Sequence, residues 1–239
     1  MEKNQSIIVI IPAYNEELNI KRVINRVKEV IPSAHILVIN DASRDNTSQV
    51  SRDAGAKVIS LPFNLGYGGA LQTGFKFALE GEYNCIVQMD ADGQHNPEDI
   101  PKILEPVQSG NADVVVGSRF LGKDNYQTSF PRRLGISFFS LIASFFIGQR
   151  ITDPTSGFQA LNRKVAEFFS SDRYPADFPD ADVLIMLHRA GFRIKEVSVR
   201  MNPGNLKKSM HSGLKPAYYI FKMLLSIFVT LLRKDIRQQ

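Results

Sequence analysis

Cysteine is nearly absent from this chain, with one residue at position 85 among 239. A single cysteine excludes an internal disulfide framework and a four-thiolate zinc site, and it favours a reducing compartment. Cys85 lies in an apolar stretch and is expected to be inert core. The four histidines lack the spacing of metal ligands, and no local Ser–His–Asp or Cys–His signature of a nucleophilic enzyme is present.

Long apolar runs are also missing. Residues 134–149 carry no charge, but the segment is short for a membrane span. Residues 1–6 are polar and Pro12 interrupts the apolar run that follows, so we expect no secretory signal. No internal repeat, nucleic-acid-binding motif or flexible linker divides the chain. With 44% hydrophobic and 22% charged residues, one globular domain with a full core is expected.

Charge is distributed unevenly along the chain. Residues 1–120 hold 11 basic and 15 acidic side chains, whereas residues 121–239 hold 18 and 9. The acidic half suggests metal ligands, and the basic half suggests phosphate or an anionic surface. A polarised but merely solvated surface is the alternative.

Apolar segments of strand length alternate with segments of helical periodicity. We expect strands at residues 7–11, 35–40, 56–61, 84–89 and 112–116, and helices at residues 16–31, 47–54, 69–79 and 97–108. This alternation predicts an α/β fold, a mostly parallel sheet with helices on both faces. Ligands of such sheets bind beyond the carboxyl ends of the strands. Polar clusters occur there, at residues 12–17, 41–45, 90–95 and 117–119.

Two carboxylates separated by one residue, Asp90 and Asp92, follow the fourth predicted strand. Both can reach one hard cation such as Mg²⁺ or Mn²⁺, and Gln94 adds a neutral oxygen. A cation with so few protein ligands keeps positions for phosphate oxygens. A turn or the start of a helix is the alternative, because residues 96–99 resemble a helix cap.

The glycine-rich segment at residues 64–70 precedes a predicted helix. It suits either a phosphate near backbone N–H groups or a tight turn with close packing, and it fits a dinucleotide-binding fingerprint poorly. Asp41 ends the second strand, where a carboxylate can accept from a nucleotide base, and Asp45 is expected to cap the next helix.

Two apolar helices with polar stripes are expected in the basic half. In the first, Ser137, Ser140, Ser144 and Gly148 share one face. In the second, residues 217–237, the stripe is Lys222, Ser226, Thr230, Arg233 and Arg237, flanked by Lys207, Lys208, Lys215 and Lys234. An apolar helix with a basic flank favours a membrane interface, with core packing or a dimer interface as the alternatives.

Six segments together resemble a known family. They are residues 11–16 (IPAYNE), 40–47 (NDASRDNT), 64–70 (NLGYGGA), 90–95 (DADGQH), 117–119 (GSR) and 152–158 (TDPTSGF). In order and spacing they resemble the family 2 glycosyltransferases of GT-A fold, and among these the polyprenol-phosphate sugar synthase branch, which includes dolichyl-phosphate mannose synthases. The resemblance covers about residues 5–200. It implies a Rossmann-like GT-A catalytic domain at residues 1–215, followed by an amphipathic interfacial helix at residues 216–239.

The resemblance also implies roles for matching residues. The nucleotide pocket would be lined by Pro12, Ala13, Tyr14, Glu16, Asp41, Gly69, Ala70, Asp90, Ala91 and Asp92, with Asp41 at the base. Asp90, Asp92 and Gln94 would hold Mg²⁺ or Mn²⁺ on the donor diphosphate. Arg119, Arg133, Ser137 and Arg200 match positions that receive the acceptor phosphate.

The implied reaction is inverting transfer of a hexose from GDP-mannose, UDP-glucose or UDP-GlcNAc to undecaprenyl or dolichyl phosphate. An anionic acceptor needs positioning more than a base. The first alternative is transfer to a glycan hydroxyl in cell-surface polysaccharide synthesis, with Asp153, Asp180 or Asp182 as base. The second is a non-catalytic nucleotide- or membrane-binding module.

Two departures from the branch bear on location. Many members carry transmembrane helices after the catalytic domain, whereas residues 216–239 are expected to lie in the interface. We therefore expect a peripheral protein at the cytoplasmic face of the cell membrane, and a small membrane-protein partner or a homo-oligomer is a further hypothesis. Residues 177–182 are also more acidic than the branch pattern.

Overall fold

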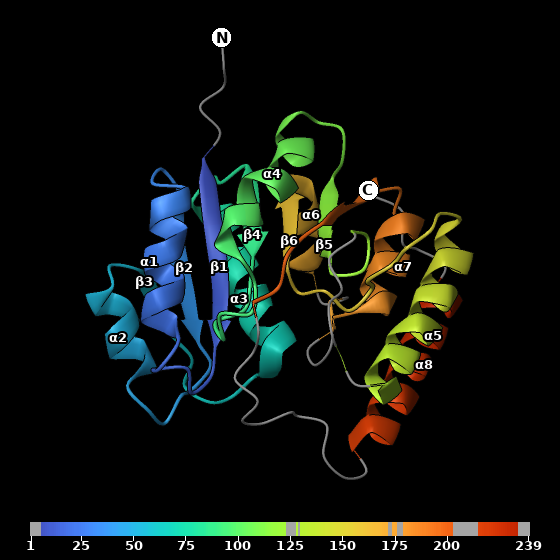
Figure 1. Cartoon of the computed structure of the whole chain (residues 1–239), viewed down its shortest axis with the longest axis horizontal. Helices are drawn as coiled ribbons and strands as arrows, with labels where there is room; N and C mark the ends of the chain where they lie inside the picture. Colours follow the sequence, from blue (N-terminus) through green and yellow to red (C-terminus); the bar gives the residue numbers. More distant parts are fainter. Residues whose placement is uncertain are drawn as a thin grey trace.

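The computed structural model of the protein describes residues 6–122, 128, 130–171, 174–175, 179–202 and 215–233 (Figure 1). In chain order the elements are β1 (Ile7–Ala13), α1 (Ile20–Val30), β2 (His35–Asn40), α2 (Thr47–Asp53), β3 (Lys57–Ser60), α3 (Gly66–Glu80), β4 (Cys85–Gln88), η1 (Pro97–Asp99), α4 (Ile100–Gln108), β5 (Val114–Ser118), α5 (Phe130–Ile147), β6 (Gln159–Asn162), α6 (Arg163–Phe169), α7 (Ala181–Arg189), β7 (Ile194–Ser198) and α8 (Lys215–Leu232). All strands and helices predicted up to residue 116 are present.

The seven strands form one mixed sheet in the order β3-β2-β1-β4-β6-β5-β7. The strand pairs β1–β2, β1–β4, β2–β3 and β5–β7 are parallel, whereas β6 is antiparallel to both β4 and β5. The predicted α/β fold with a mostly parallel sheet is therefore confirmed. The inserted antiparallel strand β6 and the edge strand β7 were not predicted.

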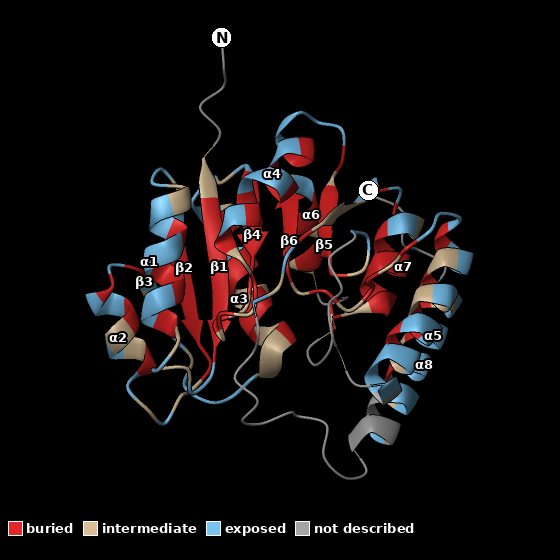
Figure 2. Cartoon of the chain, in the orientation of Figure 1, coloured by how far each residue is buried: buried red, intermediate tan, exposed pale blue. Residues whose placement is uncertain are grey.

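Helices cover both faces of the sheet, and this explains the continuous apolar run of β1. Ile8 and Ile10 pack into the core on the α3, α5 and α7 side, whereas Val9 and Ile11 pack on the α1 and α4 side. All four side chains are fully buried, so the strand appears red in Figure 2. A strand buried on both faces has no polar alternation.

The parallel strands bring distant loops to one edge. Ala13 at the end of β1 pairs with Asn40 at the end of β2, and Ile10 pairs with Gln88 at the end of β4. The residues after Gln88 therefore begin beside the carboxyl end of β1. This register places three of the predicted polar clusters at the same edge of the sheet.

Helices α5 and α8 both pack against α7 at one end of the molecule (Figure 1). The middle of the predicted polar stripe of α8 faces inward, where Thr230 is buried and the Ser226 hydroxyl donates to the Asp182 carboxylate, whereas Arg233 is exposed. The Arg189 guanidinium donates to the carbonyl oxygens of Thr230 (2.6 Å) and Arg233 (2.9 Å). Met223 and Ile227 are buried in the core on this side, so polar and apolar contacts together attach α8 to the rest of the fold, and its other large apolar side chains face outward.

Both helices expose large apolar side chains. On α5 these are Phe130, Leu134, Phe138, Leu141, Phe145 and Phe146, and on α8 they are Tyr218, Ile220, Phe221, Leu224, Leu225, Phe228, Val229 and Leu232. On α5, Ser140 and Ser144 instead bond the backbone of Ile151. Within the described residues, neither helix is long and apolar enough to cross a membrane. Lys207, Lys208, Lys234 and Arg237 lie outside the described residues, and the domain boundary at residue 215 stays a prediction.

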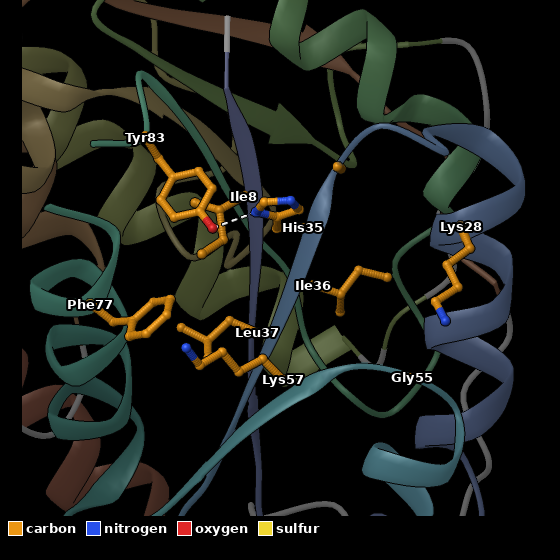
Figure 3. A pocket seen from close by; sticks show the side chains of 10 residues that line it. Ile8, Lys28, His35, Ile36, Leu37, Gly55, Lys57, Phe77 and Tyr83 are labelled. Atoms are coloured by element: carbon orange, nitrogen blue, oxygen red, sulfur yellow. Dashed lines mark hydrogen bonds between the residues drawn. The ribbon is translucent and has the colours of Figure 1, made fainter. Parts of the chain in front are cut away.

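A pocket of about 400 Å³ lies at the opposite, amino-terminal edge of β1 to β3 (Figure 3). Its polar side chains are engaged within the protein. Lys28 Nζ donates to the Ala54 carbonyl at 2.6 Å, Lys57 Nζ lies over the Phe77 ring, and His35 contacts the Tyr83 hydroxyl. This edge lies at the far end of the strands from the polar clusters, and these side chains serve packing there.

Candidate active site

Hydrogen bonds join the loops that follow β1 and β2. The backbone N–H of Asn15 donates to Ser43 Oγ (3.0 Å), and the backbone N–H of Arg44 donates to Asn15 Oδ1 (2.8 Å). The Glu16 amide donates to Thr47 Oγ1 at 2.8 Å. Asn15 has a φ of 56°, a left-handed conformation that asparagine tolerates better than most residues. The two loops therefore form one cross-linked edge.

The residues predicted to line a nucleotide pocket differ in exposure. Tyr14 is 45% exposed at this edge, whereas Pro12 and Ala13 are buried at the end of β1. Ala70, in the second turn of α3, is fully buried, and Ala91 is also buried. Ala70 and Ala91 pack in the core, so they support this edge of the sheet without lying on its surface.

Asp41 connects the second loop to the glycine-rich segment. Its carboxylate accepts from the backbone amides of Leu65 (2.7 Å) and Gly66 (3.0 Å) at the start of α3. A β-carbon added to Gly69 would lie 2.8 Å from Leu65 Cβ, so close packing explains this glycine. Asp41 thus acts as a helix cap, and its predicted contact with a base stays a prediction.

Asp90 and Asp92 lie in the turn that follows β4. The Asp90 amide donates to His95 Nδ1 (2.9 Å), so the proton of the imidazole is assigned to Nε2, which lies 3.5 Å from Asp90 Oδ2. The buried His95 ring stacks on Phe158. Asp92 accepts from both the backbone amide (2.9 Å) and the side-chain amide of Gln94.

Negative charge is concentrated at this edge. Burial raises the pKa of the Glu16 carboxyl, the nearby Asp92, Asp45 and Asp90 raise it further, and a hydrogen bond from Asn19 opposes the shift. Such a group of partly solvated carboxylates suits a hard divalent cation that also binds an anionic ligand. In the described part of the chain, no set of three or more His, Cys, Asp or Glu side chains forms a complete metal site. A cation held by two of these carboxylates would keep positions open for the oxygens of a phosphate.

Tyr67 was not assigned a role from the sequence. Its hydroxyl, on the first turn of α3, donates to Asp90 Oδ1 at 2.9 Å. Burial raises the pKa of Tyr67 well above its usual value, and the Asp90 charge adds to the effect, so the phenol keeps its proton. No sequence pattern relates a helix residue to a carboxylate 23 positions away, so only the fold reveals this contact.

Arg119 and Asp153 form a buried ion pair. Arg119 Nε and an Nη atom each donate to the carboxylate of Asp153 at 2.6 Å, and the same Nη donates to Thr155 Oγ1. Glu196 on β7 accepts from the backbone amides of Thr152 and Asp153 at 2.8 Å. Burial raises the pKa of the Glu196 carboxyl, and these two amides oppose the shift. The segment that follows α5 is thus held around the guanidinium of Arg119.

The structure argues against two of the three candidate bases. Asp153 is fully buried and paired with Arg119, and Asp182 is 1% exposed and bonded to Ser226 on α8. A general base must reach the proton that it removes. Asp180, half-buried at the start of α7, is the candidate that remains.

The other residues predicted to bind a phosphate lie on two elements. Arg200 follows β7, and the next residues run beside the Asp90 turn. There the backbone N–H of Asn202 donates to the backbone carbonyl of Gln94 at 2.8 Å. The Arg200 guanidinium lies 3.6 Å from Glu98 and 4.0 Å from Asp99. Arg133 and Ser137 are exposed on α5.

Comparison with known sequences identifies the family. The profile described as Glycosyl transferase family 2 matches residues 8–169. The chain belongs to glycosyl transferase family 2. The match contains every site element described above except β7 with Glu196, Arg200 and helices α7 and α8.

Curated relatives place this glycosyltransferase in the polyprenol-phosphate sugar synthase branch. An undecaprenyl-phosphate mannosyltransferase of Micrococcus luteus is 33% identical over 217 residues, 87% of this chain and 88% of the relative. A polyprenol monophosphomannose synthase of Mycolicibacterium smegmatis is 31% identical, over 92% of this chain and 86% of the relative. A UDP-N-acetylglucosamine–dolichyl-phosphate N-acetylglucosaminyltransferase of Methanococcus voltae is 29% identical, over 92% and 95%.

Solved structures show the same fold. Glucosyl-3-phosphoglycerate synthase of Mycobacterium tuberculosis, crystallised with Mn²⁺, UDP and phosphoglyceric acid, superposes with a TM-score of 0.72. It is 19% identical, and the match covers 97% of this chain and 78% of that chain. At this identity the likeness confirms the GT-A fold of the family 2 enzyme, and no more.

Proposed function

We propose that this glycosyltransferase moves a hexose from a nucleoside-diphosphate sugar to a polyprenyl phosphate, with inversion at the sugar carbon and with Mg²⁺ or Mn²⁺. The observation that carries the proposal is the Asp90–Asp92 turn, set at the same sheet edge as the cross-linked loops after β1 and β2. The named acceptors of the curated relatives support a polyprenyl phosphate.

The donor binds with its diphosphate at the Asp90–Asp92 turn. Asp90, Asp92 and Gln94 would hold the divalent cation, which would supply positive charge to offset the negative charge on the departing diphosphate. Tyr14 and Glu16 lie at the same edge, where the base and ribose of the donor would be accommodated. Binding of the leaving group in this way stabilises the transition state more than the bound substrate.

The acceptor phosphate binds to Arg119, Arg133, Ser137 and Arg200. The phosphate is already anionic at neutral pH, so these side chains orient it for in-line attack and no base is required. Asp153 is paired with Arg119 and Asp182 accepts from Ser226, so neither buried carboxylate is available as a base. Asp153 instead fixes the plane of the Arg119 guanidinium.

A membrane surface is the proposed location of the reaction. The apolar side chains that α5 and α8 expose, next to Arg132, Arg133 and Arg233, fit the interfacial region of an anionic bilayer. The cytoplasmic face, and a membrane-protein partner or second copy as anchor, belong to the same proposal.

A specific observation keeps transfer to a glycan hydroxyl as the second candidate. Asp180 is half-buried at the start of α7, and its charge contributes, after burial, Asp90 and Tyr174, to the raised pKa of Tyr67. The two functions separate in one assay with radiolabelled GDP-mannose, UDP-glucose and UDP-GlcNAc. Divalent-dependent label that extracts into organic solvent with undecaprenyl or dolichyl phosphate supports the first, and label found only in water-soluble glycan overturns it.

A further inference from the structure

Both oxygens of the Asp90 carboxylate have a protein neighbour. The Tyr67 hydroxyl donates to Oδ1 at 2.9 Å, and His95 Nε2 lies 3.5 Å from Oδ2. The Asp90 side chain is nevertheless 35% exposed, so it presents an open side to a ligand. His95 is fixed by its stacking on Phe158, and Tyr67 by its place on α3.

Gly157 makes the approach of Tyr67 to Asp90 sterically feasible. A β-carbon at position 157 would lie 2.5 Å from the Tyr67 hydroxyl and 3.3 Å from Asp90 Oδ1. The Gly157 carbonyl also accepts from the Gln88 side chain at 3.2 Å, which fixes this backbone against the end of β4. The glycine of the TDPTSGF segment therefore leaves the space in which the two side chains meet.

We propose that Tyr67 is a positioning residue, which orients the Asp90 carboxylate for the divalent cation of the donor complex through its hydroxyl, in the space left by Gly157. The inference rests on the proposed function, because it takes Asp90 as an ion ligand. A carboxylate free to rotate must be ordered when it binds a cation, whereas one held by a hydrogen bond is already oriented. Removing such outer contacts commonly weakens metal binding about 10- to 100-fold.

The test is titration of the protein with Mn²⁺ in the presence of UDP or GDP, with free Mn²⁺ measured by electron paramagnetic resonance. Tyr67→Phe is expected to weaken Mn²⁺ binding about tenfold. It should raise the Mn²⁺ concentration needed for half-maximal activity more than it lowers kcat at saturating Mn²⁺. Tyr83→Phe, which removes a hydroxyl at the opposite edge of the sheet, is the matched control and should bind Mn²⁺ like the wild type.

Gly157→Ala provides a second variant that acts on the same contact. It should weaken Mn²⁺ binding by displacing the Tyr67 hydroxyl, and the double variant Tyr67→Phe/Gly157→Ala should be less impaired than the two separate effects combined. Wild-type Mn²⁺ affinity in a folded Tyr67→Phe protein would overturn the inference. Asp92→Ala separates the two claims, because Mn²⁺ binding and turnover retained in that variant would overturn the ion site itself.

Discussion

Arg119 and Asp153, 34 residues apart in the chain, meet in a bidentate ion pair in which neither side chain is more than 7% exposed. A buried pair of this kind is costly to break, because the partner that remains keeps an uncompensated charge. Arg119 is thereby held in one orientation at the end of β5. The pair joins the GSR and TDPTSGF segments at one place in the fold.

Breaking this pair should destabilise the fold. Asp153→Ala is expected to lower the free energy of unfolding by about 3–5 kcal/mol, measured by urea denaturation. The double variant Arg119→Met/Asp153→Leu should recover much of that loss, because it leaves no charge buried, yet it should lack transferase activity. A double variant that is stable and fully active would exclude Arg119 from the acceptor site.

Arg133 and its neighbour Arg132 form a matched pair of exposed arginines on α5. Arg133→Ala should raise the KM for polyprenyl phosphate about tenfold or more, because a hydrogen bond to a charged group contributes roughly 1.5–3 kcal/mol. The KM for the sugar nucleotide should stay near the wild-type value. Arg132→Ala is the control, and equal effects of the two variants, or a larger effect on the donor, would contradict the assignment.

The outward face of α8 should determine association with lipid. Phe221 and Phe228, 65% and 58% exposed, lie two helical turns apart. Replacing both with Gln should reduce co-sedimentation with anionic vesicles at least tenfold, because burying each ring contributes roughly 1.5–3 kcal/mol. Phe63→Gln, at a site 63% exposed in the loop after β3, is the control. Undiminished binding by the double variant would show that this face does not contact the bilayer.

Asp182 should make stability depend on pH. Burial raises its pKa from the ordinary 3.8, and hydrogen bonds, that from Ser226 foremost, oppose the shift. The folded state therefore holds the proton to higher pH than the unfolded chain does. The contribution of protonated Asp182 to stability is complete below pH 3.8 and is lost as the pH rises through the pKa of Asp182 in the folded state. Asp182→Asn should flatten this part of the curve of unfolding free energy against pH, and an unchanged slope would contradict the assignment.

Much of the fold was predictable from the sequence because it depends on local patterns. The five continuous apolar runs indicated the strands. The parallel pairing of β1 with β2 and with β4 then places Asp41 and Asp90 at the edge where β1 and β2 end. Strand β6 was not predictable, because its four residues, Gln159–Asn162, are polar at both ends and carry no periodicity.

The side-chain contacts of the site were less predictable. The bond of Asp41 to the start of α3 could not be predicted, because it depends on how the loop before α3 packs. The polar stripe of α8 was recognised, yet its inward direction follows from Asp182 and Arg189 on another helix. Such pairings depend on tertiary distances that composition and periodicity do not encode.

The central claim is that Asp90 and Asp92 bind the cation of the donor complex. Anomalous diffraction from crystals soaked with Mn²⁺ and a nucleoside-diphosphate sugar tests it most directly. We expect a manganese peak in contact with a carboxylate oxygen of this turn and with the diphosphate of the donor. A bound donor with no manganese between its diphosphate and these two carboxylates would contradict it.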